Sequence, residues 1–196
     1  VQLVHSQPIQ WNQFRGPNGD GDAGKANLPV QFSETENLTW KTSMPGKAWS
    51  SPVVKDGKVW ITNAEEDGFK MWAIQLDWKT GKLLKKVLVF ENKEPQFCHP
   101  MNSYATPTPV IAGNQVFVHF GSHGTAALDA NTGRKIWERR DLKCDHYRGA
   151  AASPIPHLDT LIVHFDGHDL QFIVCLCQQT GKTIWKKERA YDFKTD

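Results

Sequence analysis

The sequence has little of what marks a membrane-spanning or nucleic-acid-binding protein. No apolar run approaches the about 20 residues that a membrane-spanning helix needs, so we expect no membrane span. Basic and acidic side chains nearly balance, with 23 Lys and Arg against 21 Asp and Glu and a net charge of +2. Nucleic-acid-binding domains usually carry a clear basic excess. The composition therefore gives no reason to expect nucleic acid as a partner.

Cysteine is also scarce. The 4 cysteines are too few for a disulfide-dense scaffold, and no C-x-x-C or C-x-x-C-H motif occurs, which excludes the usual zinc and c-type haem signatures. Cys98 and Cys144 could form a disulfide or remain free thiols. Cys175 and Cys177 are two apart in a β-rich run, so they share one face and are expected to pack there.

Catalytic signatures are absent too. We find no nucleophile elbow, phosphate-binding loop or zinc-protease motif, so no activity is assigned to this segment. The chain starts at Val1, and its first ten residues lack the charged start and long apolar core of a signal peptide. We interpret this start as the result of a removed leader or of trimming.

What the sequence does have is an internal repeat. Thr-Gly pairs begin at residues 80, 132 and 180, a period of about 50 residues. Each copy opens on Ser-Pro or Thr-Pro, at residues 51, 108 and 153, and continues with a β-rich run at residues 58–61, 115–118 and 160–163. A third run ends at each Thr-Gly pair and a fourth follows it. Four short strands per copy of this length indicate one propeller blade per repeat.

The Thr-Gly pair is expected to close the hairpin between the third and fourth strands of each blade. Glycine there can take positive φ, and an acidic side chain such as Asp129 can hydrogen-bond back to the turn backbone. Trp137 and Trp185 follow the glycine at the same offset in the last two copies. We expect each tryptophan to pack against the neighbouring blade.

The pattern Ala-Leu-Asp-x-x-Thr-Gly-x-x-x-Trp at residues 127–137 resembles the blade signature of PQQ-like β-propellers. That superfamily includes quinoprotein alcohol dehydrogenases and the propeller lipoprotein of outer-membrane protein assembly. The stretches WNQFRGPNG (11–19), HFGSHG (119–124) and CDHYRG (144–149) further resemble a bacterial group of exported PQQ-like repeat proteins, frequent in planctomycetes. The resemblance implies a periplasmic or secreted protein with its signal peptide removed, and it implies no particular reaction.

We therefore expect an all-β fold, a β-propeller of four-stranded antiparallel blades. Residues 1–48 would form an N-terminal segment with a latch strand at 38–41, and residues 49–196 would hold three blades, at about 49–97, 98–144 and 145–190. Closed propellers need about 4 to 8 blades. The chain would thus be the N-terminal part of a seven- or eight-bladed ring, with the remaining blades supplied by a longer chain or by other copies.

Propeller topology places two kinds of loop on one face, those that link successive blades and those between second and third strands. These loops carry six candidates for ligand binding: His99, His123, His146, Arg148, Asp166 and His168. The Thr-Gly face offers mostly Lys, Asn and Gln. A merely solvated loop face is the alternative interpretation of this asymmetry.

The motif His-Phe-x-x-His occurs twice, at residues 119–123 and 164–168. We expect His119 and His164 to pack between blades, each bonded to a backbone carbonyl. His123 and His168 would lie at the rim, where imidazoles from neighbouring blades could bind a zinc ion or another ligand.

Three functions stay open. The first is an exported binding scaffold that holds a ligand or protein partner on the histidine-bearing face, with Arg148 as the anion contact. The second is a quinoprotein-type oxidoreductase with PQQ and calcium. The sequence has no adjacent cysteine pair and no mappable calcium ligands, so no cofactor is evident and that site would need the missing blades. The third is a structural assembly protein of the cell envelope.

Overall fold

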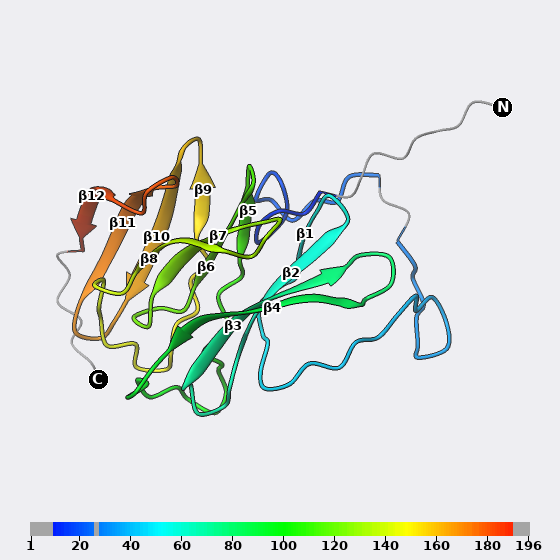
Figure 1. Cartoon of the computed structure of the whole chain (residues 1–196), viewed down its shortest axis with the longest axis horizontal. Coiled ribbons are helices and arrows are strands. Elements are labelled where there is room, and N and C mark those ends of the chain that lie inside the picture. Colours follow the sequence, from blue (N-terminus) through cyan, green and yellow to red (C-terminus); the bar gives the residue numbers. More distant parts are fainter. Residues whose placement is uncertain (1–9, 26–27, 190–196) are drawn as a thin grey trace.

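The fold consists of three antiparallel sheets of four strands each (Figure 1). The computed structural model describes residues 10–25 and 28–189. In every sheet the strands pair in chain order, from an inner first strand to an outer fourth strand. The first sheet contains β1 (Val53–Lys55), β2 (Lys58–Ala64), β3 (Lys70–Asp77) and β4 (Leu83–Glu91). The second contains β5 (Val110–Ala112), β6 (Gln115–His119), β7 (Thr125–Asp129) and β8 (Lys135–Arg139). The third contains β9 (Ile155–His157), β10 (Thr160–Asp166), β11 (Gln171–Cys177) and β12 (Thr183–Glu188).

The hydrophobic core lies between the sheets rather than inside one layer. Side chains alternate between the two faces of a strand. In the second sheet, Val116, Val118 and Leu128 pack against the first sheet. Phe117 and Ala127, next to them in sequence, pack against the third. Since both faces are covered, the middle strands β6 and β7 are almost entirely buried apolar runs.

The sheets come together along their inner strands. β1 contacts β5, and β5 contacts β9. Four-stranded antiparallel sheets that face each other and meet at their first strands are propeller blades. The predicted all-β propeller fold is confirmed, and each predicted blade segment contains one sheet.

The Thr-Gly turns form as predicted. Asp129 Oδ1 accepts hydrogen bonds from the backbone N–H groups of Asn131 (3.0 Å) and Thr132 (2.7 Å) and from the Thr132 hydroxyl (2.9 Å). Asp77 makes the same three bonds in the first blade. The glycines at 81, 133 and 181 have φ of +67°, +78° and +69°, a region that favours glycine.

Trp137, which follows the second Thr-Gly turn, packs against the third blade as predicted, whereas Trp185 is 43% exposed and faces no further blade among the described residues. Trp137 Nε1 donates to the carbonyl of Gln178 at 2.7 Å, and the Trp137 ring lies over Gly181. Trp40, in the N-terminal segment, repeats this contact on the first blade. Its Nε1 donates to the carbonyl of Trp78 at 2.9 Å, and its ring lies over Gly81. Trp40 therefore takes the position of a fourth-strand tryptophan.

The predicted latch strand at 38–41 is not a strand in this structure. Its position is held by the tryptophan contact instead, because no strand within the described residues lies beside it to supply ladder hydrogen bonds. Residue 190, the end of the predicted third blade, lies outside the described residues. So do residues 1–9, which make up most of the stretch that lacks the features of a signal peptide.

Candidate functional site

One end of the blades is built from loops that bond to one another. We call this end the loop face; it comprises residues 65–69, 92–104, 120–124, 140–150 and 166–170. The carbonyl of Cys144 accepts from Gln96 Nε2 (3.0 Å) and from the Ser122 hydroxyl (2.7 Å). The backbone N–H of Asp145 donates to Asp169 Oδ1 (2.6 Å). All six predicted site residues lie on this face, which the loops of neighbouring blades share.

Two of the six are built into the loop face rather than presented on it. His123 Nδ1 lies 3.1 Å from the Phe120 carbonyl, and its Nε2 accepts from the backbone N–H of Gln96 at 3.1 Å. Both ring nitrogens are therefore used in the neutral imidazole, and burial lowers the pKa of His123 to about 4. His146 is 8% exposed, stacks on Phe165, and burial lowers its pKa as well.

The other four are accessible. His99 is half-buried, and its Nδ1 accepts from the backbone N–H of Met101 at 3.1 Å. Arg148 is exposed and lies over the Tyr147 ring, 5.7 Å from its centroid. His168 Nδ1 is 3.5 Å from Asp145 Oδ2, and Asp166 is 3.2 Å from His164 Nε2. The structure thus divides the predicted set into one buried residue, two half-buried residues and three exposed residues.

The first histidines of the two His-Phe-x-x-His motifs differ from the prediction. His119 is buried between blades, but its Nδ1 pairs with the Thr125 hydroxyl at 2.8 Å instead of a carbonyl. Thr125 is its cross-strand neighbour on β7, and so reaches it first. Burial lowers the pKa of His119 to about 3. His164 is half-buried and contacts Arg189 and Asp166 at the open side of the third blade, where no carbonyl faces it.

The cysteines are all free, so the Cys98–Cys144 disulfide does not form. Cys98 Sγ packs toward Gly149 and the carbonyl of Arg148, whereas Cys144 Sγ faces Ser122 and His146 Nε2, the latter at 3.3 Å. Burial raises the pKa of Cys144 to about 11 and raises that of Cys98. Neither thiol is poised as a nucleophile.

Three exposed residues of the loop face were not among the predicted candidates. Phe97, Met101 and Tyr147 are 66%, 80% and 67% exposed. They join His99, Arg148 and His168 in one line of contacts, which we call the loop-face ridge. The Phe97 and His99 rings are 6.5 Å apart, and the Tyr147 and His168 rings are 6.2 Å apart. The backbone N–H of His99 donates to the Arg148 carbonyl at 3.4 Å. The sequence signal for the three was the presence of aromatic and Met residues in loops predicted to lie on this face.

The described residues contain no group of three or more His, Cys, Asp or Glu side chains placed to hold a metal ion. No helix among them is both long and apolar enough to cross a membrane. The loop face is chemically suited to contacts by aromatic, thioether and guanidinium groups, which characterise recognition surfaces.

Blades joined along their inner strands, with loops gathered at one end, define the class of β-propeller repeat proteins. A family model described as outer membrane protein assembly factor BamB matches residues 24–140 and again residues 74–196. These matches span most of the chain, which therefore belongs to this PQQ-like family. Among curated proteins, none matches.

Solved structures show the same fold. A europium-containing methanol dehydrogenase has a TM-score of 0.55 and 17% identity, over 77% of this chain and 27% of its own length. BamB from Moraxella catarrhalis has a TM-score of 0.51 and 17% identity, over 76% and 39%. The chain thus spans well under half the length of these structures. At such identity they show the fold alone.

Proposed function

We propose that this chain is part of an exported β-propeller, periplasmic or secreted, that binds a protein partner through the loop-face ridge. The observation that carries the proposal is the exposure of Phe97, Met101 and Tyr147 on one face, each more than 60% exposed, with Arg148 over the Tyr147 ring. Aromatic residues, Met and Arg are enriched in protein interfaces.

The description of the matching family, an outer membrane protein assembly factor, supports a role in assembly at the cell envelope. In this proposal Phe97, Met101 and Tyr147 supply the apolar contact. Arg148 supplies a planar fork for a carboxylate of the partner. His99 and His168, which also belong to the ridge, would make polar contacts. Further blades, from a longer chain or from other copies, would complete the ring.

A photo-crosslinking amino acid placed at Tyr147 tests the proposal in the cells that make the protein. Leu158, 86% exposed in the turn between β9 and β10 at the opposite end of the blade, is the matched control. We expect one discrete cross-linked species from position 147 and none from position 158. The same pattern of bands at both positions would contradict a specific ridge. Replacing His99 and His168 by Ala would then separate a contact that needs the histidines from one that uses only the apolar side chains.

A further inference from the structure

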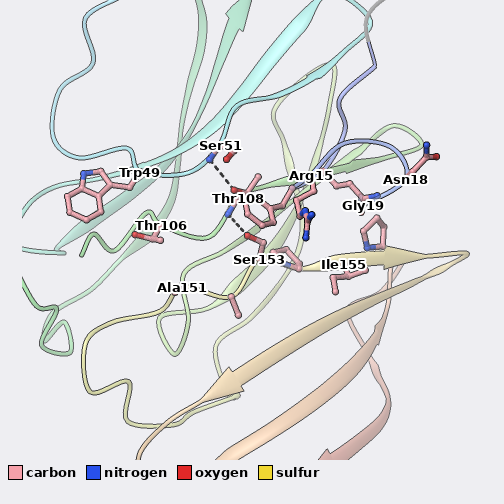
Figure 2. A pocket seen from close by; sticks show the side chains of 15 residues that line it. Arg15, Asn18, Gly19, Trp49, Ser51, Thr106, Thr108, Ala151, Ser153 and Ile155 are labelled. Atoms are coloured by element: carbon pink, nitrogen blue, oxygen red, sulfur yellow. Dashed lines mark hydrogen bonds between the residues drawn. The ribbon is translucent and has the colours of Figure 1, made fainter. Parts of the chain in front are cut away.

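A cavity of about 710 Å³ lies at the inner edge of the blades, away from the loop-face ridge (Figure 2). Its walls are the N-terminal loop at residues 13–19, Trp49, and the approaches to β1, β5 and β9. Figure 2 shows Trp49 toward one end and Ile155 and Asn18 toward the other. Small-molecule sites typically measure about 300 to 1,000 Å³, so the cavity could hold a compact ligand.

One wall is a row of hydroxyl groups that crosses all three blades. The backbone N–H of Ser51 donates to Thr108 Oγ1 at 3.0 Å, and the backbone N–H of Thr108 donates to Ser153 Oγ at 3.0 Å. These are the residues of the repeated Ser-Pro and Thr-Pro starts. Because each of these two oxygens already accepts a backbone hydrogen, its own hydroxyl hydrogen is left to donate. Thr108 is only 2% exposed, whereas Ser51 and Ser153 are half-buried, so the row presents hydroxyl groups to the cavity mainly at its two ends.

Arg15 gives the cavity its charge. It is the one ionisable side chain among the described lining residues, and it holds a left-handed backbone with φ of +64°. That conformation is uncommon for a residue other than glycine and often occurs at functional sites. Its Nη2 donates to the Asp20 carbonyl at 3.0 Å, which orients the guanidinium. With no lining carboxylate, the cavity favours an anion.

Two aromatic side chains provide flat apolar walls. Phe14 and Trp49 line the cavity and are 51% and 49% exposed. Half-exposed aromatic rings beside hydrogen-bond donors suit a ligand with an apolar face and polar edges. The cavity thus combines a guanidinium, a row of donors and aromatic faces.

We infer that this cavity binds a small acidic saccharide of one or two rings, with its carboxylate on Arg15 and its ring oxygens along the Ser51–Thr108–Ser153 row. A saccharide spreads oxygen atoms along its length, as the row spreads donors. An aromatic acid gathers its oxygens at the carboxylate and would leave the row without acceptors. This site shares no residue with the loop-face ridge, so either could fail without the other.

Calorimetric titration with digalacturonate tests the inference, with the neutral disaccharide cellobiose and with benzoate for comparison. We expect digalacturonate to bind and cellobiose and benzoate to bind at least tenfold more weakly. Arg15→Asn should lower the affinity for digalacturonate at least tenfold, since a hydrogen-bonded charge pair is lost. Asn tolerates the left-handed backbone, so this variant should fold. Arg134→Asn, in the exposed turn between β7 and β8 and outside the cavity lining, should change nothing.

The inference fails if digalacturonate does not bind, if Arg15→Asn binds it as tightly as the original protein, or if benzoate binds more tightly. Trp49→Ala provides a second, independent variant, because it removes an aromatic wall and keeps the charge. It should lower the affinity for digalacturonate without making the protein prefer benzoate. Unchanged affinity in Trp49→Ala would overturn the assignment of the ring to the aromatic wall.

Discussion

The ring of Trp137 on β8 lies directly over Gly181 in the Thr-Gly turn of the next blade. A Cβ placed on Gly181 would be 2.7 Å from the Trp137 ring. Gly181 also has φ of +69°. The glycine is thus required twice, by its own backbone and by the tryptophan of the neighbouring blade. This contact joins the second blade to the third.

Gly181→Ala should therefore destabilise the protein more than Gly113→Ala. Gly113 has φ of +56° but open space where a Cβ would be, so its variant measures the backbone cost alone. We expect about 1 kcal/mol for Gly113→Ala and a further 1–3 kcal/mol or so for Gly181→Ala from the clash. Urea unfolding of both variants gives the comparison. Equal losses would show that Trp137 moves aside without cost.

Cys177→Asp should stabilise the third Thr-Gly turn. Cys177 occupies the position of Asp77 and Asp129, whose carboxylates each accept three hydrogen bonds within their turns. An added carboxylate should raise the free energy of unfolding by about 1 kcal/mol at neutral pH, and Asp129→Ala should lower it by about as much. Thermal unfolding measures both. A destabilising Cys177→Asp would mean that the third turn differs from the others.

The pH dependence of stability should be dominated by two histidines that are desolvated in the fold: His119, which ends β6, and His123, which follows it. Burial lowers the pKa of His119 to about 3 and of His123 to about 4, below the ordinary value of 6.5. As the pH falls below 6.5, His119 and His123 therefore become protonated in the unfolded chain but stay neutral in the folded protein. Stability is full above that pH and is lost progressively toward pH 3. His119 alone should account for about 2 kcal/mol of the loss by pH 5.

His119→Gln tests this directly, with the exposed His157→Gln as control. The difference in unfolding free energy between pH 7 and pH 5 should shrink by about 2 kcal/mol in His119→Gln and stay the same in His157→Gln. An unchanged difference in both variants would mean that His119 is protonated within the fold.

The loop-face ridge should contribute little to folding. Met101 and Tyr147 are mostly exposed, so Met101→Asp and Tyr147→Asp should change the free energy of unfolding by less than about 0.5 kcal/mol. Urea unfolding checks this before any binding experiment is interpreted. A larger loss would assign these side chains to packing instead of recognition.

The repeat made the blades predictable, because each copy encodes its own local structure. Asp129, Thr132 and Gly133 fix a turn within five residues, and alternating side chains identify strands that are buried on both faces. Local signals of this kind survive without knowledge of the rest of the chain. The third turn was recognised even with Cys177 in place of the aspartate.

The candidate site was less predictable, since it depends on contacts distant in sequence. The Asn12 carbonyl accepts from the N–H of Ile111, and this contact helps carry the N-terminal loop into the inner edge of the blades. From the sequence, His123 is expected to be an exposed rim residue. In the structure it accepts a hydrogen bond from the backbone N–H of Gln96, 27 residues earlier. Only the assembled loops show which histidines are buried and hydrogen-bonded within them. The same holds for the exposure of Phe97, Met101 and Tyr147 on one face.

The most direct measurement of the central claim is the yield of the cross-linked species from position 147, compared with and without Met101→Asp. If the loop-face ridge binds a protein, the aspartate should remove most of the cross-linked species while leaving the amount of folded protein unchanged. If Met101→Asp leaves the yield of the cross-linked species unchanged, or if position 158 gives an equal yield, the assignment of partner binding to this face is contradicted.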